Sequence, residues 1–166
     1  MQVFYFGVGS DIVLGMETLK QNECRSCCPL ANSLDVIGDR WSLLVIRDMM
    51  FANKHEFSEF MQGPEKIATN ILTDRLKCLQ EFGIIDYRRH PKHKNKKIYY
   101  LTQKGKDLLP AMVELILWGA SYRAAPDMPK AHFNKVKREP KKFIRVTLQK
   151  LEAWEEKNLS VIARQS

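Results

Sequence analysis

The feature that most constrains this chain is a change of hydrophobic period at Gly83. Before it, residues 67–83 place leucines at helical spacing, at Leu72, Leu76 and Leu79. After it, residues 84–89 and 98–101 are rich in β-branched and aromatic side chains, which favour strands. The segment between these two runs contains Pro91 and several lysines, as a polar turn does. The pattern therefore predicts a helix that ends at Gly83 and leads directly into a basic β-hairpin.

Further helices are predicted on both sides of this unit. Pro29 can begin a helix that ends near Gly38, and Asp39 can cap the next one. Residues 55–57 could form one short strand, and a small helix follows from Ser58. After the hairpin, Thr102 can cap a long helix to about Tyr122, with Pro110 as a possible kink inside it, and residues 141–158 form a last amphipathic helix. The order of elements predicts an α+β, mainly helical fold: a winged helix-turn-helix with a long C-terminal dimerisation helix.

We divide the chain into an N-terminal extension (1–27), a DNA-binding and dimerisation domain (28–123), and a basic C-terminal linker with an amphipathic helix (124–166). The 27 lysines and arginines exceed the 19 acids and give a net charge of +8. A basic surface favours a polyanionic partner, nucleic acid before an anionic membrane. We find no run of 18 apolar residues and no signal-peptide pattern, so we expect a cytoplasmic protein with no membrane segment.

Polar residues lie opposite the three leucines on the predicted helix before the hairpin. Asparagine can pair with adenine in the major groove, threonine can contact the thymine methyl group, and lysines in the hairpin turn can contact phosphates. Arg75, on the flank of that helix, could equally contact a phosphate or form a salt bridge at the edge of the core. The predicted DNA-binding residues are Thr69, Asn70, Thr73, Arg75, Lys77, Lys92, Lys94, Lys96 and Lys97.

Several segments together resemble the HxlR-type family of bacterial transcription regulators, relatives of the MarR winged-helix proteins. They are Cys28-Pro29, LDVIGDRWSLLVIRDM, FSEF, KIATNILTDRLKCLQEFGII and YYLTQKGKDLLP, in that order. The resemblance implies a homodimer on a palindromic or pseudo-palindromic operator, with residues 69–82 as recognition helix and the hairpin as wing. Lys97 stands where the family usually has arginine, and residues 124–166 have no counterpart in the short family pattern.

Cys28 occupies the position at which some members of that family carry a redox-sensing cysteine. Pro29 places it just before a helix, where a thiolate is stabilised. Cys28 could sense oxidants, with Cys24 or Cys27 resolving the product, or all three could be silent thiols. Cys78 suits core packing. We expect no catalytic residues, no metal site and no cofactor.

The dimer is predicted to form through Leu108, Met112, Leu115, Ile116 and Trp118, beside Leu30 and Leu34. For the C-terminal region two alternatives remain open: a basic tail that adds DNA affinity, and a solvated linker followed by a helix docked on the dimer. The favoured function is a sequence-specific DNA-binding regulator that acts as a homodimer, and a response to a small molecule or an oxidant stays open. The alternative is a winged-helix protein-interaction module without DNA binding; a thiol enzyme ranks third.

Overall fold

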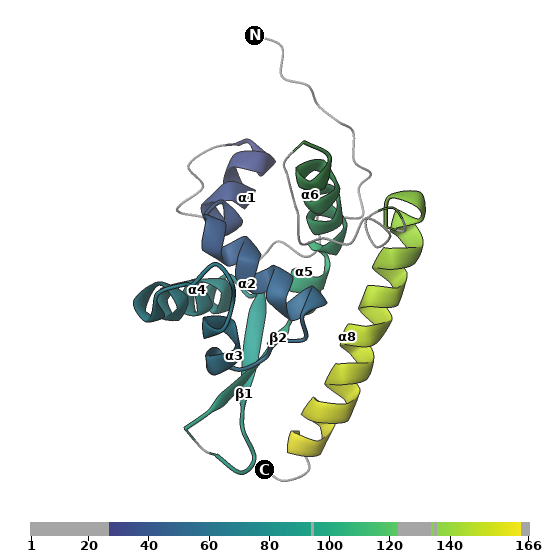
Figure 1. The fold of residues 1–166 in the computed structure, drawn as a ribbon. Helices are drawn as coiled ribbons and strands as arrows, with labels where there is room; N and C mark the ends of the chain where they lie inside the picture. Colours follow the sequence, from purple (N-terminus) through teal and green to yellow (C-terminus); the bar gives the residue numbers. More distant parts are fainter. Residues whose placement is uncertain (1–26, 94, 123–133, 135, 164–166) are drawn as a thin grey trace.

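The computed structural model describes residues 27–93, 95–122, 134 and 136–163, with side chains described up to residue 159 (Figure 1). The expected N-terminal extension up to residue 26, with Cys24, lies outside the described residues, as do Lys94, Lys130 and Lys135. The elements follow one another as α1 (Pro29–Ile37), α2 (Arg40–Phe51), α3 (Phe57–Met61), α4 (Thr69–Glu81), β1 (Ile85–Arg89), β2 (Lys97–Leu101), α5 (Gln103–Lys106), α6 (Leu109–Tyr122) and α8 (Pro140–Ala163).

The fold is the predicted α+β winged helix-turn-helix. Helices α2, α3 and α4 lead into the antiparallel pair β1 and β2, whose register runs from Ile85 opposite Leu101 to Arg89 opposite Lys97. Figure 1 shows α1 and α6 at one end of the molecule and the hairpin turn at the other, with α4 and α8 on opposite sides. Helix α4, the hairpin, and the end formed by α1 and α6 therefore point in three different directions (Figure 1).

Two local signals act as predicted. The Asp39 carboxylate accepts hydrogen bonds from the backbone N–H groups of Trp41 and Ser42 and so caps α2. Gly83 adopts a left-handed conformation with φ of 65°, which glycine tolerates without a steric penalty. In this conformation the N–H of Gly83 reaches the Gln80 carbonyl and the N–H of Ile84 reaches the Leu79 carbonyl. The chain thus leaves α4 and enters β1 within three residues.

The prediction of one long, kinked helix after Thr102 was wrong. Thr102 caps only the short helix α5, its hydroxyl accepting a hydrogen bond from the Gly105 N–H. Helix α6 starts anew at Leu109. Pro110 occupies the second position of α6, where its missing N–H has no helical acceptor to lose. Pro110 therefore helps to begin α6 rather than bending a continuous helix.

The predicted strand at 55–57 is reduced to one bridge. Glu56 pairs with Ile98 in an isolated antiparallel bridge, and α3 already begins at Phe57. Glu59 accepts hydrogen bonds from the N–H groups of His55 and Glu56, which fixes the start of α3 and leaves no room for a longer strand.

Helix α8 packs on the same core as the rest of the fold. Leu151 of α8 and Val136 just before it belong to the buried cluster that also contains Ile46, Leu72 and Leu109. The Phe143 ring lies 5.9 Å from the ring of Phe51, centre to centre. The described residues on the two sides of the boundary at 123/124 that we drew from the sequence thus share one hydrophobic core.

Candidate nucleic-acid interface

Helix α4 presents a polar face to solvent because its apolar face is fully used in the core. Leu72, Leu76 and Leu79 are buried. The opposite face is exposed and carries Thr69, Asn70, Thr73 and Lys77. The Thr73 hydroxyl donates to the Thr69 carbonyl, and the Lys77 ammonium lies 3.7 Å from the carboxylate of Glu81 one turn on. This face offers an amide, methyl groups and a cation on one side of a single helix.

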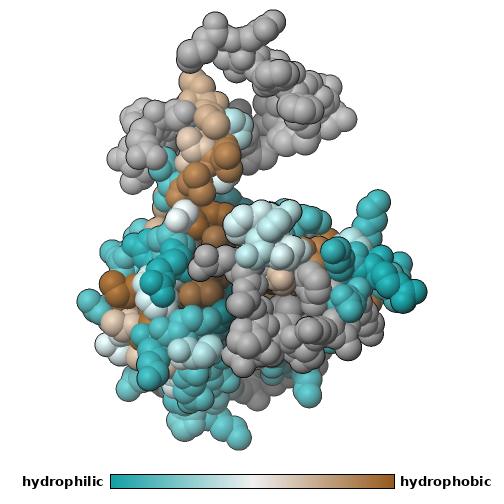
Figure 2. All heavy atoms as spheres, turned by 45° about the horizontal axis from the view of Figure 1, so that its top comes forward, coloured by the Kyte–Doolittle hydropathy of each residue, from teal (hydrophilic) through white to brown (hydrophobic). Residues whose placement is uncertain are grey.

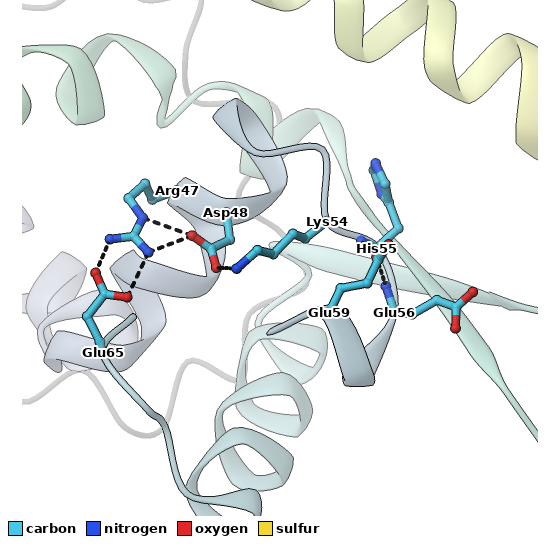
Figure 3. A network of polar contacts seen from close by, with 7 residues as sticks. All are labelled: Arg47, Asp48, Lys54, His55, Glu56, Glu59 and Glu65. Atoms are coloured by element: carbon cyan, nitrogen blue, oxygen red, sulfur yellow. Dashed lines mark hydrogen bonds and ion pairs between the residues drawn. The ribbon is translucent and has the colours of Figure 1, made fainter. Parts of the chain in front are cut away.

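A polar network ties the turn before α4 to α2 (Figure 3). The Arg47 guanidinium donates to both carboxylate oxygens of Glu65, at 2.5 and 3.1 Å, and also to Asp48. Lys54 donates to the other oxygen of Asp48 at 2.6 Å. The hydrogen bonds from Arg47 hold the pKa of Glu65 below its ordinary value, although burial opposes the shift. The network therefore fixes the start of α4 by charged pairs rather than by apolar contact alone.

Sequence reasoning missed this network. Its one visible signal is Asp48, an acid that follows Arg47 among the apolar residues of α2 and is buried. A buried carboxylate requires a nearby positive charge or hydrogen-bond donors, but the sequence alone does not identify which lysine or arginine side chains pair with Asp48.

Arg75 forms a salt bridge at the edge of the core, which was one of the two alternatives for it. Its guanidinium donates to Asp39 at 3.2 Å and, more closely, to the neighbouring Asp74. Burial alone would raise the pKa of Asp39. The hydrogen bonds that its carboxylate accepts from Ser42, Trp41 and Arg75 together outweigh burial, so the pKa lies below its ordinary value. Arg75 thus joins α4 to the start of α2 with its charge already matched by two acids.

The lysines of the hairpin lie in different surroundings. Lys92 is exposed, whereas Lys96 donates to Glu56 at 3.0 Å with about half of its side chain exposed. The Lys97 ammonium lies 3.9 Å from the centre of the Tyr87 ring, a cation–π contact. The hairpin is therefore basic, but Lys96 also contacts Glu56 outside the hairpin and Lys97 contacts Tyr87 on the paired strand.

The residues expected in the dimer do not all reach the surface. Met112 is buried in the core of its own protomer, Leu108 packs against that core, and Ile116 is partly buried. Large apolar side chains are instead exposed on α1 and α6 at Leu30, Leu34, Leu115, Trp118 and Tyr122. Figure 2 brings this end of the molecule forward and shows apolar residues gathered there. Among the described residues of α1 and α6, these five are the large apolar side chains that are exposed, and we call them the α1/α6 face.

The cysteines and histidines form no metal cluster in the part of the chain that the structure describes. Cys28 is exposed at the N-cap of α1, next to exposed Cys27, and burial raises the pKa of the half-buried Cys78 thiol. Over the same residues, no helix is both long and apolar enough to cross a membrane.

The basic segment at the start of α8 lies away from α4. Its exposed cations are Lys137, Arg138, Lys141, Lys142 and Arg145. Figure 1 shows this end of α8 near α6, across the molecule from α4 and far from the hairpin turn. The structure docks α8 on the core of its own chain, whereas the second alternative for this region placed this helix on a dimer.

Comparison with known proteins gives one consistent result. A model of the HxlR-like helix-turn-helix family matches residues 36–127, which is more than half of the chain. An uncharacterized HTH-type transcriptional regulator of Mycobacterium tuberculosis is 31% identical over 100 residues, which are 60% of this chain and 62% of that protein. The HTH-type regulator YdeP of Bacillus subtilis is 30% identical over 58% of this chain and 74% of its own.

Solved structures agree with the sequence matches. The candidate transcription factor PA1607 has a TM-score of 0.56 and 39% identity, over 63% of this chain and 72% of its own. The redox regulator HypR in its oxidized form has a TM-score of 0.52 and 31% identity, over 59% of this chain and the whole of its own. In all of these comparisons a large part of the chain lies outside the similarity.

Proposed function

Because this chain belongs to the HxlR-like helix-turn-helix family, we propose that it is a sequence-specific DNA-binding regulator that acts as a homodimer on a pseudo-palindromic operator. The relatives that it matches are named as transcriptional regulators. The chain spans about 62% of the mycobacterial relatives, so their names alone do not define the activity of the whole protein.

The observation that carries the proposal is the exposed polar face of α4. Asn70 and Thr73 lie one turn apart on the side opposite the buried leucines, so both can reach base edges in one major groove. The Arg47–Glu65 pair holds the start of this helix against α2, and Arg75 holds its middle against Asp39. A recognition helix needs such fixed placement because base contacts depend on hydrogen-bond geometry.

The hairpin supplies contacts of a different kind. Lys92 and Lys96 are flexible cations that contact phosphates without reading sequence. Lys96 exchanges its bond to Glu56 for a phosphate, and Lys97 keeps its place over Tyr87. The wing therefore adds affinity for any duplex, and α4 adds preference for one sequence.

Dimerisation through the α1/α6 face matches this arrangement. The face lies at the end of the molecule away from the hairpin turn, so two protomers joined there leave both wings accessible (Figure 1). A two-fold dimer presents two copies of α4 to half-sites about one helical turn, or a multiple of it, apart.

Cys28 gives the proposed regulator a means of responding to oxidants. It is an exposed thiol at the N-cap of α1, whose Leu30 and Leu34 belong to the α1/α6 face. Oxidation there changes the charge or linkage of the chain beside the dimer surface. The similar protein HypR is named a redox regulator, which favours this response over silent thiols.

A winged-helix interaction module that does not bind DNA is the second candidate. The experiment selects duplexes from a random library, then titrates the selected and a scrambled duplex with two variants. Asn70→Ala/Thr73→Ala is expected to lose about 1–3 kcal/mol of binding free energy per half-site on the selected duplex and little on the scrambled one. Lys92→Ala/Lys96→Ala is expected to weaken both duplexes alike and to reduce the salt slope by about one unit per lost phosphate contact.

Lys141→Ala/Lys150→Ala on α8 is the matched control, since it removes the same charge away from α4. It should leave both titrations nearly unchanged. Failure of wild type to select any duplex would refute the proposal and favour the interaction module. Equal losses on both duplexes for the α4 variant would refute base reading by Asn70 and Thr73.

A further inference from the structure

His55 is a buried node between the body of the domain and the wing. Only 6% of the residue is exposed. Its carbonyl accepts a hydrogen bond from the N–H of Tyr99 at 2.8 Å, and its ring Nδ1 lies 2.9 Å from the Tyr99 carbonyl. A carbonyl only accepts, so Nδ1 carries the proton in this bond. Both polar groups of the Tyr99 backbone, in the middle of β2, are thus held by one residue outside the hairpin.

Helix α8 covers this node. The Trp154 ring lies parallel to the His55 ring, with 3.4 Å between their centres and 6° between their planes. The next residue, Glu155, accepts from Lys106 of α5 at 2.6 Å, and the two side chains are 22% and 9% exposed. Asn158 donates back to the Trp154 carbonyl at 2.7 Å, which fixes this turn of α8. Consecutive residues of α8 therefore contact the two segments that adjoin β2, one before α3 and one after the strand.

We propose that Trp154 and Glu155 are positioning residues for the wing, which they hold against the body of the domain through His55 and Lys106. This inference rests on the proposed DNA-binding function, because it assigns the wing a task that α8 supports. A two-stranded hairpin is marginally stable by itself, so its direction depends on what it packs against. The family similarity ends at residue 127, so this support comes from a part of the chain outside the shared fold.

The effect of α8 falls on the wing and not on the recognition helix. Helix α4 is held by α2, α1 and α3 and by Arg47–Glu65 and also packs against strand β1, but its principal contacts do not include α8. Loosening Trp154 should therefore weaken contacts with phosphates while leaving base contacts intact. A duplex of any sequence then loses the same factor in affinity.

The test compares two aromatic truncations on the same helix. Trp154→Ala removes the stack on His55, whereas Phe143→Ala removes the stack on Phe51 near the other end of α8 and serves as the matched control. Hydrogen exchange is measured without DNA, residue by residue, in β2 and in α4. Trp154→Ala should speed exchange of the Tyr99 amide about tenfold with α4 unchanged, and Phe143→Ala should leave Tyr99 unchanged. Trp154→Phe, which keeps an aromatic ring, should restore most of the protection.

Titration of selected and scrambled duplexes completes the test. Trp154→Ala should weaken both about three- to tenfold with an unchanged ratio, and Glu155→Gln, a milder change, should do so to a lesser extent. Uniformly faster exchange across β2 and α4 would show that Trp154 supports only global stability and would overturn the inference, as would wild-type exchange at Tyr99. If wild type binds no duplex, the proposed function fails, while selective loss of Tyr99 protection still supports the bracing of the wing.

Discussion

Replacing Trp118 with alanine should dissociate the proposed dimer. Trp118 lies on α6 between exposed Leu115 and exposed Tyr122, and its ring is tilted by 45° to the Tyr122 ring with 5.7 Å between the ring centres. A large aromatic side chain buried at a subunit interface is the type of residue that most often dominates binding.

The magnitude follows from its exposure. A tryptophan presents roughly 250 Å² at most, so the 62% exposed in the protomer amounts to about 150 Å². At about 25 cal/mol per Å², complete burial contributes about 4 kcal/mol per side chain. Two copies meet at a two-fold interface, and burial of half of this area gives about 4 kcal/mol in total. We therefore expect the dimer dissociation constant to rise roughly a hundred- to a thousandfold.

Sedimentation equilibrium over a range of protein concentrations measures this constant directly. Val146→Ala is the control, because Val146 is the one large exposed apolar residue outside α1 and α6 among those that the structure describes. It should leave the dissociation constant unchanged, and far-ultraviolet circular dichroism should show that both variants are folded. A Trp118→Ala protein that dimerises as tightly as wild type would refute the assignment of this face.

Three further predictions concern single residues. Leu72→Ala should lower the free energy of unfolding by about 2–5 kcal/mol in urea, because it opens a cavity beneath α4 at a fully buried position. Burial lowers the pKa of His55 below 6.5, although Tyr99 and Glu59 oppose this, so the unfolded chain takes up a proton that the native state resists. Stability should therefore be complete above about pH 6.5 and fall as the pH drops towards 5, a slope that urea midpoints should show and that His55→Gln should flatten. Peroxide should release wild type from its selected duplex but not Cys28→Ser, and release that persists in the variant would remove Cys28 from the response.

The parts of the fold that sequence predicted are those set by local chemistry. Asp39 could be recognised as a cap because its short carboxylate reaches N–H groups two and three residues on. Gly83 marked the end of α4 because few other residues adopt its positive φ. The spacing of Leu72, Leu76 and Leu79 fixed the buried face of α4 and, by exclusion, its exposed face.

The parts that sequence missed depend on contacts between distant segments. Thr102 and Pro110 each suggest a helix start, but only the packing of α5 against β2 shows that each of them begins a separate helix. A side-chain methyl at Gly105 would lie 2.2 Å from the Ile84 carbonyl oxygen, so only glycine lets α5 approach the chain this closely. Arg47 gave no sign that it would meet Glu65, because Glu65 lies 18 residues further along the chain.

The family similarity ends at residue 127, but the hydrophobic core of the fold continues into α8. Leu151 and Val136 are buried with the winged-helix core, and the Trp154 ring covers the His55 ring. A fragment that ends near residue 127 would therefore expose to solvent the apolar surface that α8 covers in the intact chain. We expect such a fragment to bind hydrophobic dyes and to aggregate, and the intact chain to unfold in one transition with a correspondingly steep denaturant dependence. For this protein, the homologous segment defines the ancestry of the domain, and the packing of α8 defines its physical extent.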